Sequence, residues 1–322
     1  MGVDAMNERA RAVIAVVVQT AIVIGGFFVG KEALHAIPAG PLVLMRSAGA
    51  ALVLAMLAPV LARGEAPVRK PGDRSRLMWL GVAGVPVNQG LFLYGLTWTT
   101  AAHAALLYSL TPAIVFLMGV QRGVEKLTRA RVLGILLALA GVVLVLLDAA
   151  FHAPAPVAAG AASAASHQAA GKSPIVGDLM ILVAVFAWAG YTAYSRELVG
   201  RIGAVRATAG ALGYGALLYA PIGIVAWWHL GWNPSTAPAA AWGSLAWLIL
   251  LSSVVAYLLW YYAIKRLDPS RVAIFNNLQP IGVALGQWLV FGIPLGAAFM
   301  IGGSLAVAGV VTAQRDRLRP TA

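Results

Sequence analysis

The sequence contains no cysteine, and only 11% of its 322 residues are charged. The absence of cysteine excludes disulfide bonds and thiolate metal sites. A soluble domain carries about 25% charged residues, so this chain has too few charges to cover itself with a surface suited to water. Hydrophobic residues make up 61% of the chain. The composition therefore predicts a protein whose outer surface contacts lipid.

Acidic residues are the scarcer charge, with 11 Asp and Glu against 23 Lys and Arg and a net charge of +12. In a soluble protein this excess would suggest a nucleic-acid partner. Here 20 of the 23 cations fall in six segments that share one side of the membrane if the N-terminus is cytoplasmic: 1–11, 63–76, 122–131, 196–206, 265–271 and 315–319. This asymmetry predicts that both termini are cytoplasmic, in a bacterial-type inner membrane, and it accounts for the charge without nucleic acid.

Ten apolar runs follow one another along the chain. Each is close to the ~20 residues with which a helix crosses a ~30 Å hydrocarbon core. Lipid cannot satisfy an open backbone, and the runs are too long for barrel strands, so all ten are predicted to be helices. The first run resembles a signal peptide but is too long for one, and we interpret it as a retained helix. The runs cover residues 12–30, 40–62, 76–97, 101–121, 130–148, 175–195, 207–229, 241–264, 270–291 and 296–313.

One long segment occurs twice. Residues 77–143 align without a gap on residues 245–311 after a shift of 168 positions, and about 20 of the 67 pairs are identical, including Trp79/Trp247 and Pro112/Pro280. A period of half the chain indicates two copies of one unit. Five helices per copy is an odd number, so the second copy enters the membrane from the opposite face. Inverted-topology repeats are typical of secondary transporters, whose sites lie near the midplane at the repeat interface.

The expected domains are therefore residues 1–148, with five helices, and residues 175–322, with five more. Between them, residues 149–174 are rich in Ala, Pro, Ser and Gly, and we predict an external flexible linker. This linker contains Gly171-Lys172-Ser173, the tail of a phosphate-binding loop, but Ser166 stands where the first glycine of that motif is required. ATP binding is not expected.

Several motifs resemble the EamA domain of the drug/metabolite transporter superfamily. They are Leu110-Thr111-Pro112, the loop 125–128, the small-residue helix 134–141 and, in the second half, Asn277-Leu278-Gln279-Pro280. The resemblance spans essentially the whole chain and rests on the order and spacing of the motifs. It implies an all-α polytopic membrane protein with ten helices that exports or exchanges small metabolites or drugs. Glu125 is replaced by Ile293 in the second copy, so the resemblance does not imply that this acid is needed twice.

Polar and aromatic residues inside the apolar runs are the candidates for binding a solute, because they are costly in lipid and tend to face a cavity. Pro112 and Pro280 occupy matching positions and are predicted to interrupt their helices, the best pointer to a transporter site. In the alternative interpretation, the prolines only kink the helices, the amides bond neighbouring helices, and the aromatic residues anchor the membrane interface. The candidates are Gln19, Asn88, Tyr108, Trp188, Tyr191, Tyr257, Trp260, Asn276, Asn277 and Gln279.

Charged residues within the apolar runs are few. Arg46 lies in the outer third of its run, where its side chain is expected to extend toward the membrane surface, with contact to an anionic solute as the alternative. No carboxylate or histidine is predicted at mid-span, so proton coupling is poorly marked. Glu32 and His103, both near the outer ends of helices, are candidates for it, and a group exposed to water is the alternative for each.

The leading hypothesis is a secondary-active, alternating-access exporter or exchanger of small organic solutes, embedded in the lipid bilayer. A passive channel or scramblase is a second interpretation. A membrane-embedded enzyme is a third, but the sequence has no HExxH, no GxSxG and no acid pair at useful spacing, so no catalytic residues, metal or cofactor are expected. Gly134/Ala138 and Gly302/Ala306 predict close helix packing, either within one chain or between two copies in a homodimer.

Overall fold

The computed structural model describes residues 2–65, 67, 70–99, 101–126, 128–151, 174–291 and 297–315. Every regular element within these residues is a helix. The linker predicted at 149–174 lies almost wholly outside the described residues.

Among the described residues, six continuous helical segments are long and apolar enough to cross a membrane, judged by length and composition. Two of them pass through a π-helical stretch, a wider turn that often occurs at functional sites. The segments are α1 (Gly2–Ala36), α2 (Ala39–Leu61), α3–η1–α4 (Pro71–Val82, Ala83–Gly90, Leu91–Leu96), α9 (Pro174–Ile202), α10 (Ala204–Leu230) and α11–η3–α12 (Ala239–Trp247, Leu248–Val255, Ala256–Ile264).

Among the remaining elements, the two helices that contain the repeated prolines each begin at a break in the regular α-helical backbone. Pro112 and Pro280 are each the second residue of a helix, where the missing backbone N–H costs little. The elements are α5 (Ala101–Tyr108), α6 (Thr111–Gln121), α7 (Arg129–Phe151), the short 3₁₀ helix η2 (Pro234–Thr236), α13 (Pro269–Ala273), the 3₁₀ helix η4 (Ile274–Leu278), α14 (Gln279–Phe291) and α15 (Ala297–Arg315).

Two helices extend well beyond the apolar runs that predicted them. Helix α9 continues to Ile202 rather than ending near residue 195, so Arg196 and Arg201 lie in its last turns and not in a loop. Helix α1 likewise includes residues 2–11. Hydropathy detects only the part of a helix that contacts lipid, and charged residues such as Arg and Glu are good helix formers outside it.

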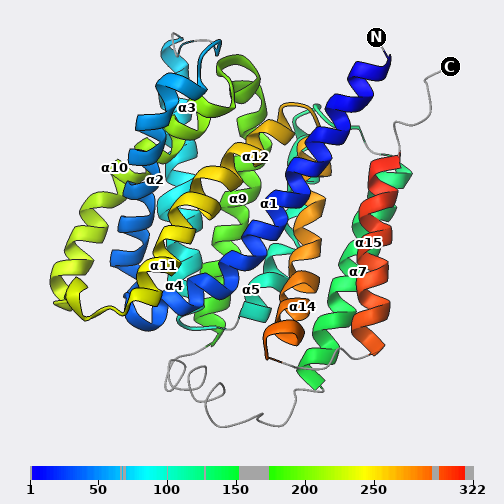
Figure 1. The fold of residues 1–322 in the computed structure, drawn as a ribbon. Helices are drawn as coiled ribbons and strands as arrows, with labels where there is room; N and C mark the ends of the chain where they lie inside the picture. Colours follow the sequence, from blue (N-terminus) through cyan, green and yellow to red (C-terminus); the bar gives the residue numbers. More distant parts are fainter. Residues whose placement is uncertain are drawn as a thin grey trace.

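The helices form one bundle (Figure 1). At one side, α10 packs against α2 and α3, and at the other side α7 and α15 lie next to each other. Helix α1 runs diagonally between them and contacts α11, α12 and α14. The α7–α15 contact is close: a Cβ atom added at Gly309 would lie 2.5 Å from the carbonyl oxygen of Gly134. Small residues permit this backbone approach.

The distribution of polarity is the reverse of that in a soluble protein. Large apolar side chains are exposed, such as Trp228 at 84% and Leu289 at 71%, whereas Gln19 and Ser253 are buried. Because lipid offers no hydrogen bonds, polar groups turn inward and apolar groups outward. The chain is an integral membrane protein.

Candidate functional site

A cavity of about 90 Å³ lies inside the bundle. It is smaller than the ~300–1,000 Å³ of pockets for drug-sized ligands. Its walls come from both halves of the sequence, and they combine aromatic rings with amides, hydroxyls and one arginine. The polar and aromatic lining residues are Gln19, Phe27, Arg46, Asn88, Gln89, Phe92, Tyr108, Trp188, Ser252, Tyr257, Asn276 and Gln279.

Seven of the ten residues predicted to bind a solute line this cavity: Gln19, Asn88, Tyr108, Trp188, Tyr257, Asn276 and Gln279. The other three, Tyr191, Trp260 and Asn277, are fully buried behind the lining. The buried side-chain oxygen and nitrogen of Asn277 have no hydrogen-bond partner among the described residues. Such a group is costly unless another conformation, water or a solute satisfies it.

Asn88 fixes the position of one tyrosine in the wall. Its amide nitrogen donates to the carbonyl oxygen of Ala184 at 2.9 Å and to the hydroxyl oxygen of Tyr108 at 2.6 Å. Since the carbonyl can only accept, the contact with Ala184 identifies which amide atom is the nitrogen. The amide therefore ties η1 to α9 and holds the Tyr108 hydroxyl, which keeps its own hydrogen to donate.

Gln89 and Tyr257 join the two halves directly. The side-chain nitrogen of Gln89 donates to the Tyr257 hydroxyl at 3.0 Å, and the two residues are 168 positions apart, the repeat shift itself. The same shift relates Tyr108 to Asn276 and Asn88 to Ala256, and all six residues line the cavity. The cavity therefore has matching positions of the two copies on its walls.

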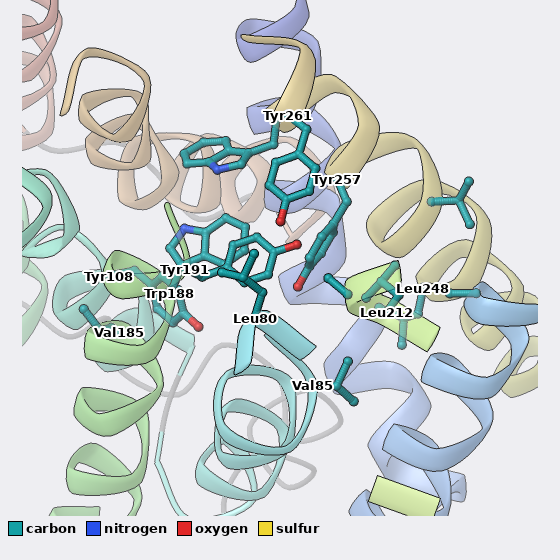
Figure 2. Close-up of a cluster of buried hydrophobic side chains, with 14 of the residues drawn as sticks. Leu80, Val85, Tyr108, Val185, Trp188, Tyr191, Leu212, Leu248, Tyr257 and Tyr261 are labelled. Atoms are coloured by element: carbon teal, nitrogen blue, oxygen red, sulfur yellow. The ribbon is translucent and has the colours of Figure 1, made fainter. Parts of the chain in front are cut away.

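Aromatic rings from α9 and α12 pack together beside the cavity (Figure 2). Trp188 stacks on Tyr191 with ring centroids 5.3 Å apart, and Tyr191 stacks on Tyr261 at 5.5 Å. Trp260 contacts Trp188 at 5.2 Å. In α9 the lining residue Trp188 is followed one turn later by Tyr191, toward the helix end at Ile202. In α12 the lining residue Tyr257 is followed one turn later by Trp260 and Tyr261, toward the helix end at Ile264. The rings thus separate the cavity from that end of the bundle.

Arg46 occupies the cavity wall, which corrects the expectation that it extends to the membrane surface. Its side chain is buried, and its Nε donates to the hydroxyl oxygen of Ser253 on η3 at 2.8 Å. The depth of Arg46 in its helix permitted either position, but the face of α2 on which it lies points inward, toward η3.

The two candidates for proton coupling lie apart from the lining. Glu32 is exposed to the surroundings and does not contact the cavity. His103 is in α5, but its side chain lies outside the described part of the chain. Among the described residues, no group of three or more His, Asp or Glu side chains could hold a metal ion.

Two polar lining residues were not predicted from the sequence, namely Gln89 and Ser252. Gln89 follows Asn88 within η1, where the wider π-helical turn changes the face on which each residue lies. The repeat could have predicted Gln89 as a lining residue. The shift of 168 positions aligns Gln89 with Tyr257, which was predicted to bind a solute. Ser252 lies beside Ser253 in the π-helical η3, and nothing in the apolar run around these two serines distinguishes a lining residue from a packing residue.

At the end of the bundle near Ile202 and Ile264, charged side chains connect loops that are distant in sequence. We call Glu125, Arg131, Arg196, Asp268 and Ser270 the loop cluster. Arg131 donates to Glu125 Oε2 at 3.1 Å and to Asp268 Oδ2 at 2.7 Å, and Arg196 donates to Asp268 Oδ1 at 3.2 Å. Glu125 also accepts from the backbone nitrogen of Ser270 at 3.2 Å and from its hydroxyl. Burial raises the pKa of Glu125 above its ordinary value, against the opposing effect of these donors.

The same end carries two further links. Glu65, in the loop after α2, accepts from the backbone nitrogens of Val205 and Arg206 at 3.1 and 2.9 Å and so caps the start of α10. Arg201 forms an ion pair with Asp73 at the start of α3. The loops before α3, α7, α10 and α13 therefore gather at one end of the bundle, the end predicted from the cation count to be cytoplasmic.

A helical membrane bundle with an internal polar cavity is typical of a transporter. A model of the EamA-like transporter family matches the chain twice, at residues 10–147 and 175–313. The chain therefore belongs to the EamA-like transporter family. This agrees with the resemblance seen in the sequence motifs.

Individual relatives agree with this family. An uncharacterized transporter of Archaeoglobus fulgidus is 26% identical over 72% of this chain and 73% of its own length. A protein of Streptantibioticus cattleyicolor named "Probable terminal-alkyne amino-acid exporter" is 26% identical over 83% of this chain and 82% of its own. A solved crystal structure shares the fold, with a TM-score of 0.71 and 21% identity over 98% of this chain and 99% of that one. The matching family and the two named relatives are described as transporters or exporters, so the chain is a transporter rather than an enzyme.

Proposed function

We propose that this protein is a secondary-active carrier that exports or exchanges small organic solutes by alternating access through the internal cavity. Its two halves are five-helix repeats of inverted topology, which give ten membrane spans. The observation that carries the proposal is the Gln89–Tyr257 hydrogen bond, in which a residue meets its own counterpart in the other repeat. A residue can touch its copy only near an axis that relates the two halves, so this contact supports a cavity at the repeat interface.

The interrupted helices support the same proposal. The break between α5 and α6 precedes Pro112, and the 3₁₀ helix η4 precedes Pro280, at matching positions of the two repeats. Breaks of this kind free backbone groups from helical hydrogen bonds beside a cavity. Discontinuous helices at equivalent places are a common feature of transporter sites.

In the proposed cycle, the protein has closed the end that carries the loop cluster. The rings of Trp188, Tyr191, Trp260 and Tyr261 lie between the cavity and that end, and the ion pairs of the loop cluster close over them. Opening this end requires the ion pairs to separate. Because both termini lie in the cytoplasm of a bacterial-type cell in this proposal, the end that carries the loop cluster is the cytoplasmic gate.

The topology can be tested by labelling single introduced cysteines, because the natural chain has none. We expect a cysteine at Arg63 to react with a membrane-impermeant maleimide only from the cytoplasmic side. A cysteine at Asn233, in the turn between α10 and α11, should react only from the outer side. Reaction of both positions from the same side would rule out the inverted arrangement.

The carrier mechanism requires a measurement of flux. Purified protein in liposomes should transport a radiolabelled solute with saturation, and unlabelled solute on the opposite side should accelerate it. The Trp188→Ala variant removes a wall of the cavity and should lose this flux, whereas Trp228→Ala changes an exposed, lipid-facing ring and should retain it. Flux that never saturates and shows no acceleration from the opposite side indicates a channel instead.

A further inference from the structure

Arg46 is a buried cation with no anionic partner. It is 8% exposed, and its one side-chain hydrogen bond in the described structure is the 2.8 Å contact from Nε to the Ser253 hydroxyl. No carboxylate of the described residues forms an ion pair with it. A charge inside a membrane protein is costly, and such residues normally pair with an opposite charge or mark a solute pathway.

The acidic residues of the described chain are occupied elsewhere or face outward. Glu125 and Asp268 bind Arg131, Asp73 binds Arg201, and Glu65 caps α10. None of the residues lining the cavity is an Asp or Glu. The guanidinium of Arg46 therefore faces a space that offers no negative charge of its own.

Two tyrosine hydroxyls line the same space and have hydrogens to donate. Tyr108 accepts from Asn88, and Tyr257 accepts from Gln89, so in each case an amide N–H fills the acceptor role of the hydroxyl oxygen. The O–H of each remains available. Arg46 lines the same cavity as both tyrosines. A planar fork of N–H groups beside two O–H donors suits a carboxylate.

The rest of the cavity suits an apolar group rather than a second charge. Phe27, Phe92 and Trp188 form part of its wall. Phe27 and Phe92 meet edge to face with centroids 5.4 Å apart, so they present an ordered aromatic surface. The volume of about 90 Å³ limits the occupant to a small molecule.

We propose that the solute carried by this protein is a small organic acid, bound through its carboxylate by Arg46, Tyr108 and Tyr257. Its apolar part lies against Phe27, Phe92 and Trp188. This inference rests on the proposed carrier function, because it names the substrate class of the same cavity. The solute supplies the negative charge that the protein lacks there.

The test compares carboxylates with their uncharged amides on purified protein. The probes are propionate and propionamide, with L-alanine as a carboxylate that also carries an ammonium group and inorganic phosphate as an anion without an apolar part. Binding is measured by the shift of the thermal midpoint and by isothermal titration calorimetry. We expect propionate or L-alanine to bind and propionamide not to. If L-alanine alone binds, the class narrows to amino acids.

Arg46→Gln should weaken carboxylate binding by about 30-fold or more, the usual effect of removing one partner of a buried charge pair. Arg46→Lys should restore part of it. The matched control is Arg63→Gln, which removes the same charge from an exposed position just beyond the end of α2. Each variant is first shown to elute as a single species with an unchanged helical spectrum, so a loss of binding is not a loss of folding.

The outcomes separate the two proposals. Equal binding of acid and amide, binding of phosphate as strong as that of the organic acids, or carboxylate binding that survives in Arg46→Gln would each overturn the inference. Saturable exchange of neutral or cationic solutes, unchanged in Arg46→Gln, would overturn it and leave the carrier function standing. Arg46-dependent carboxylate binding without saturable flux in liposomes would support the anion site and contradict the carrier.

Discussion

Two buried arginines show how differently this protein treats charge in its cavity and at its closed end. Arg131 in the loop cluster is 8% exposed and binds two carboxylates, Glu125 and Asp268. Arg46 is equally buried, but its partner is the hydroxyl of Ser253. Burial removes water from both cations, but carboxylates of the protein compensate only Arg131 for this loss.

The difference separates groups that hold the structure from groups that await a ligand. The loop cluster joins α7, α9 and α13 through charge-assisted hydrogen bonds, which are stronger than bonds between neutral groups. The cavity contains buried polar atoms without partners, including Gln89 Oε1, Gln279 Oε1 and Ser252 Oγ. Native proteins rarely leave such atoms unsatisfied, and those that do so usually have a functional reason.

The largest effect is expected where the loop cluster loses a shared carboxylate. Asp268 accepts from Arg131 and Arg196 and forms a third ion pair with Arg271 at 3.4 Å. Asp268→Asn leaves buried guanidinium groups without that charge, so we expect a loss of about 3–5 kcal/mol in the free energy of unfolding. The measurement is denaturant-induced unfolding in detergent micelles, followed by circular dichroism.

Glu197→Gln is the matched control for Asp268→Asn. It also removes a carboxylate that forms two ion pairs, with Arg76 and Arg201, but that carboxylate is 58% exposed. Exposed pairs contribute about 0–1 kcal/mol. Similar losses for the two variants would contradict the assignment of the loop cluster as a structural lock.

The cavity should respond in the opposite direction. Arg46→Gln removes a cation that lacks a counter-ion, and replacement of a buried charge by a neutral group of similar size is often stabilising. We expect the empty protein to gain about 1–2 kcal/mol, a common gain when a functional site is simplified. The gain should disappear when both proteins are unfolded in saturating propionate, because the ligand stabilises only the wild type. A loss of several kcal/mol in the empty protein would show that Arg46 holds the fold together.

Much of the fold could be predicted from the sequence, because the membrane limits the backbone to helices and hydropathy locates them. The helix lengths were less accurate, since Arg196 and Arg201 extend α9 beyond the lipid. Seven lining residues could be predicted because each is polar or aromatic within an apolar run. Tyr191 and Trp260 have the same signal but lie in the second layer, and no pattern in the chain separates a wall from the layer behind it.

The position of Arg46 could not be predicted for a related reason. Its depth in the membrane is visible in the sequence, but the face of α2 that turns inward depends on how α2 packs against η3 and α10. The loop cluster was equally hidden. Its members come from loops and helix ends in both halves of the chain, and the sequence alone identifies Glu125 and Asp268 only as loop charges.

A smaller effect should sharpen the symmetry of the cavity. Gln89 and Tyr257 form one hydrogen bond between neutral groups, so the pair should contribute about 1 kcal/mol. A double-mutant cycle with Gln89→Met and Tyr257→Phe measures this contribution. The coupling energy is the difference between the loss of unfolding free energy in the double variant and the sum of the losses in the two single variants. Coupling near zero would show that the two residues do not interact where the halves meet.

The smallest effect concerns pH at the loop cluster. Burial raises the pKa of Glu125 above the ordinary value of 4.5, so the folded protein holds this proton more tightly than the unfolded chain does. The stability from this site is therefore fully present below pH 4.5 and is lost as the pH rises through the folded pKa. Glu125→Gln, which resembles the protonated acid, should remove this dependence.

The measurement is the difference between the thermal midpoints of wild type and Glu125→Gln across a pH series in identical buffers. Glu8 and Glu197 have pKa values lowered by arginine partners, so their contributions run the other way, but they are common to both proteins and cancel in the difference. Wild type should lose midpoint temperature relative to the variant as the pH rises above 4.5. Parallel profiles would mean that Arg131 and Ser270 fully offset the burial of this carboxylate, and that the loop cluster does not respond to protons through Glu125.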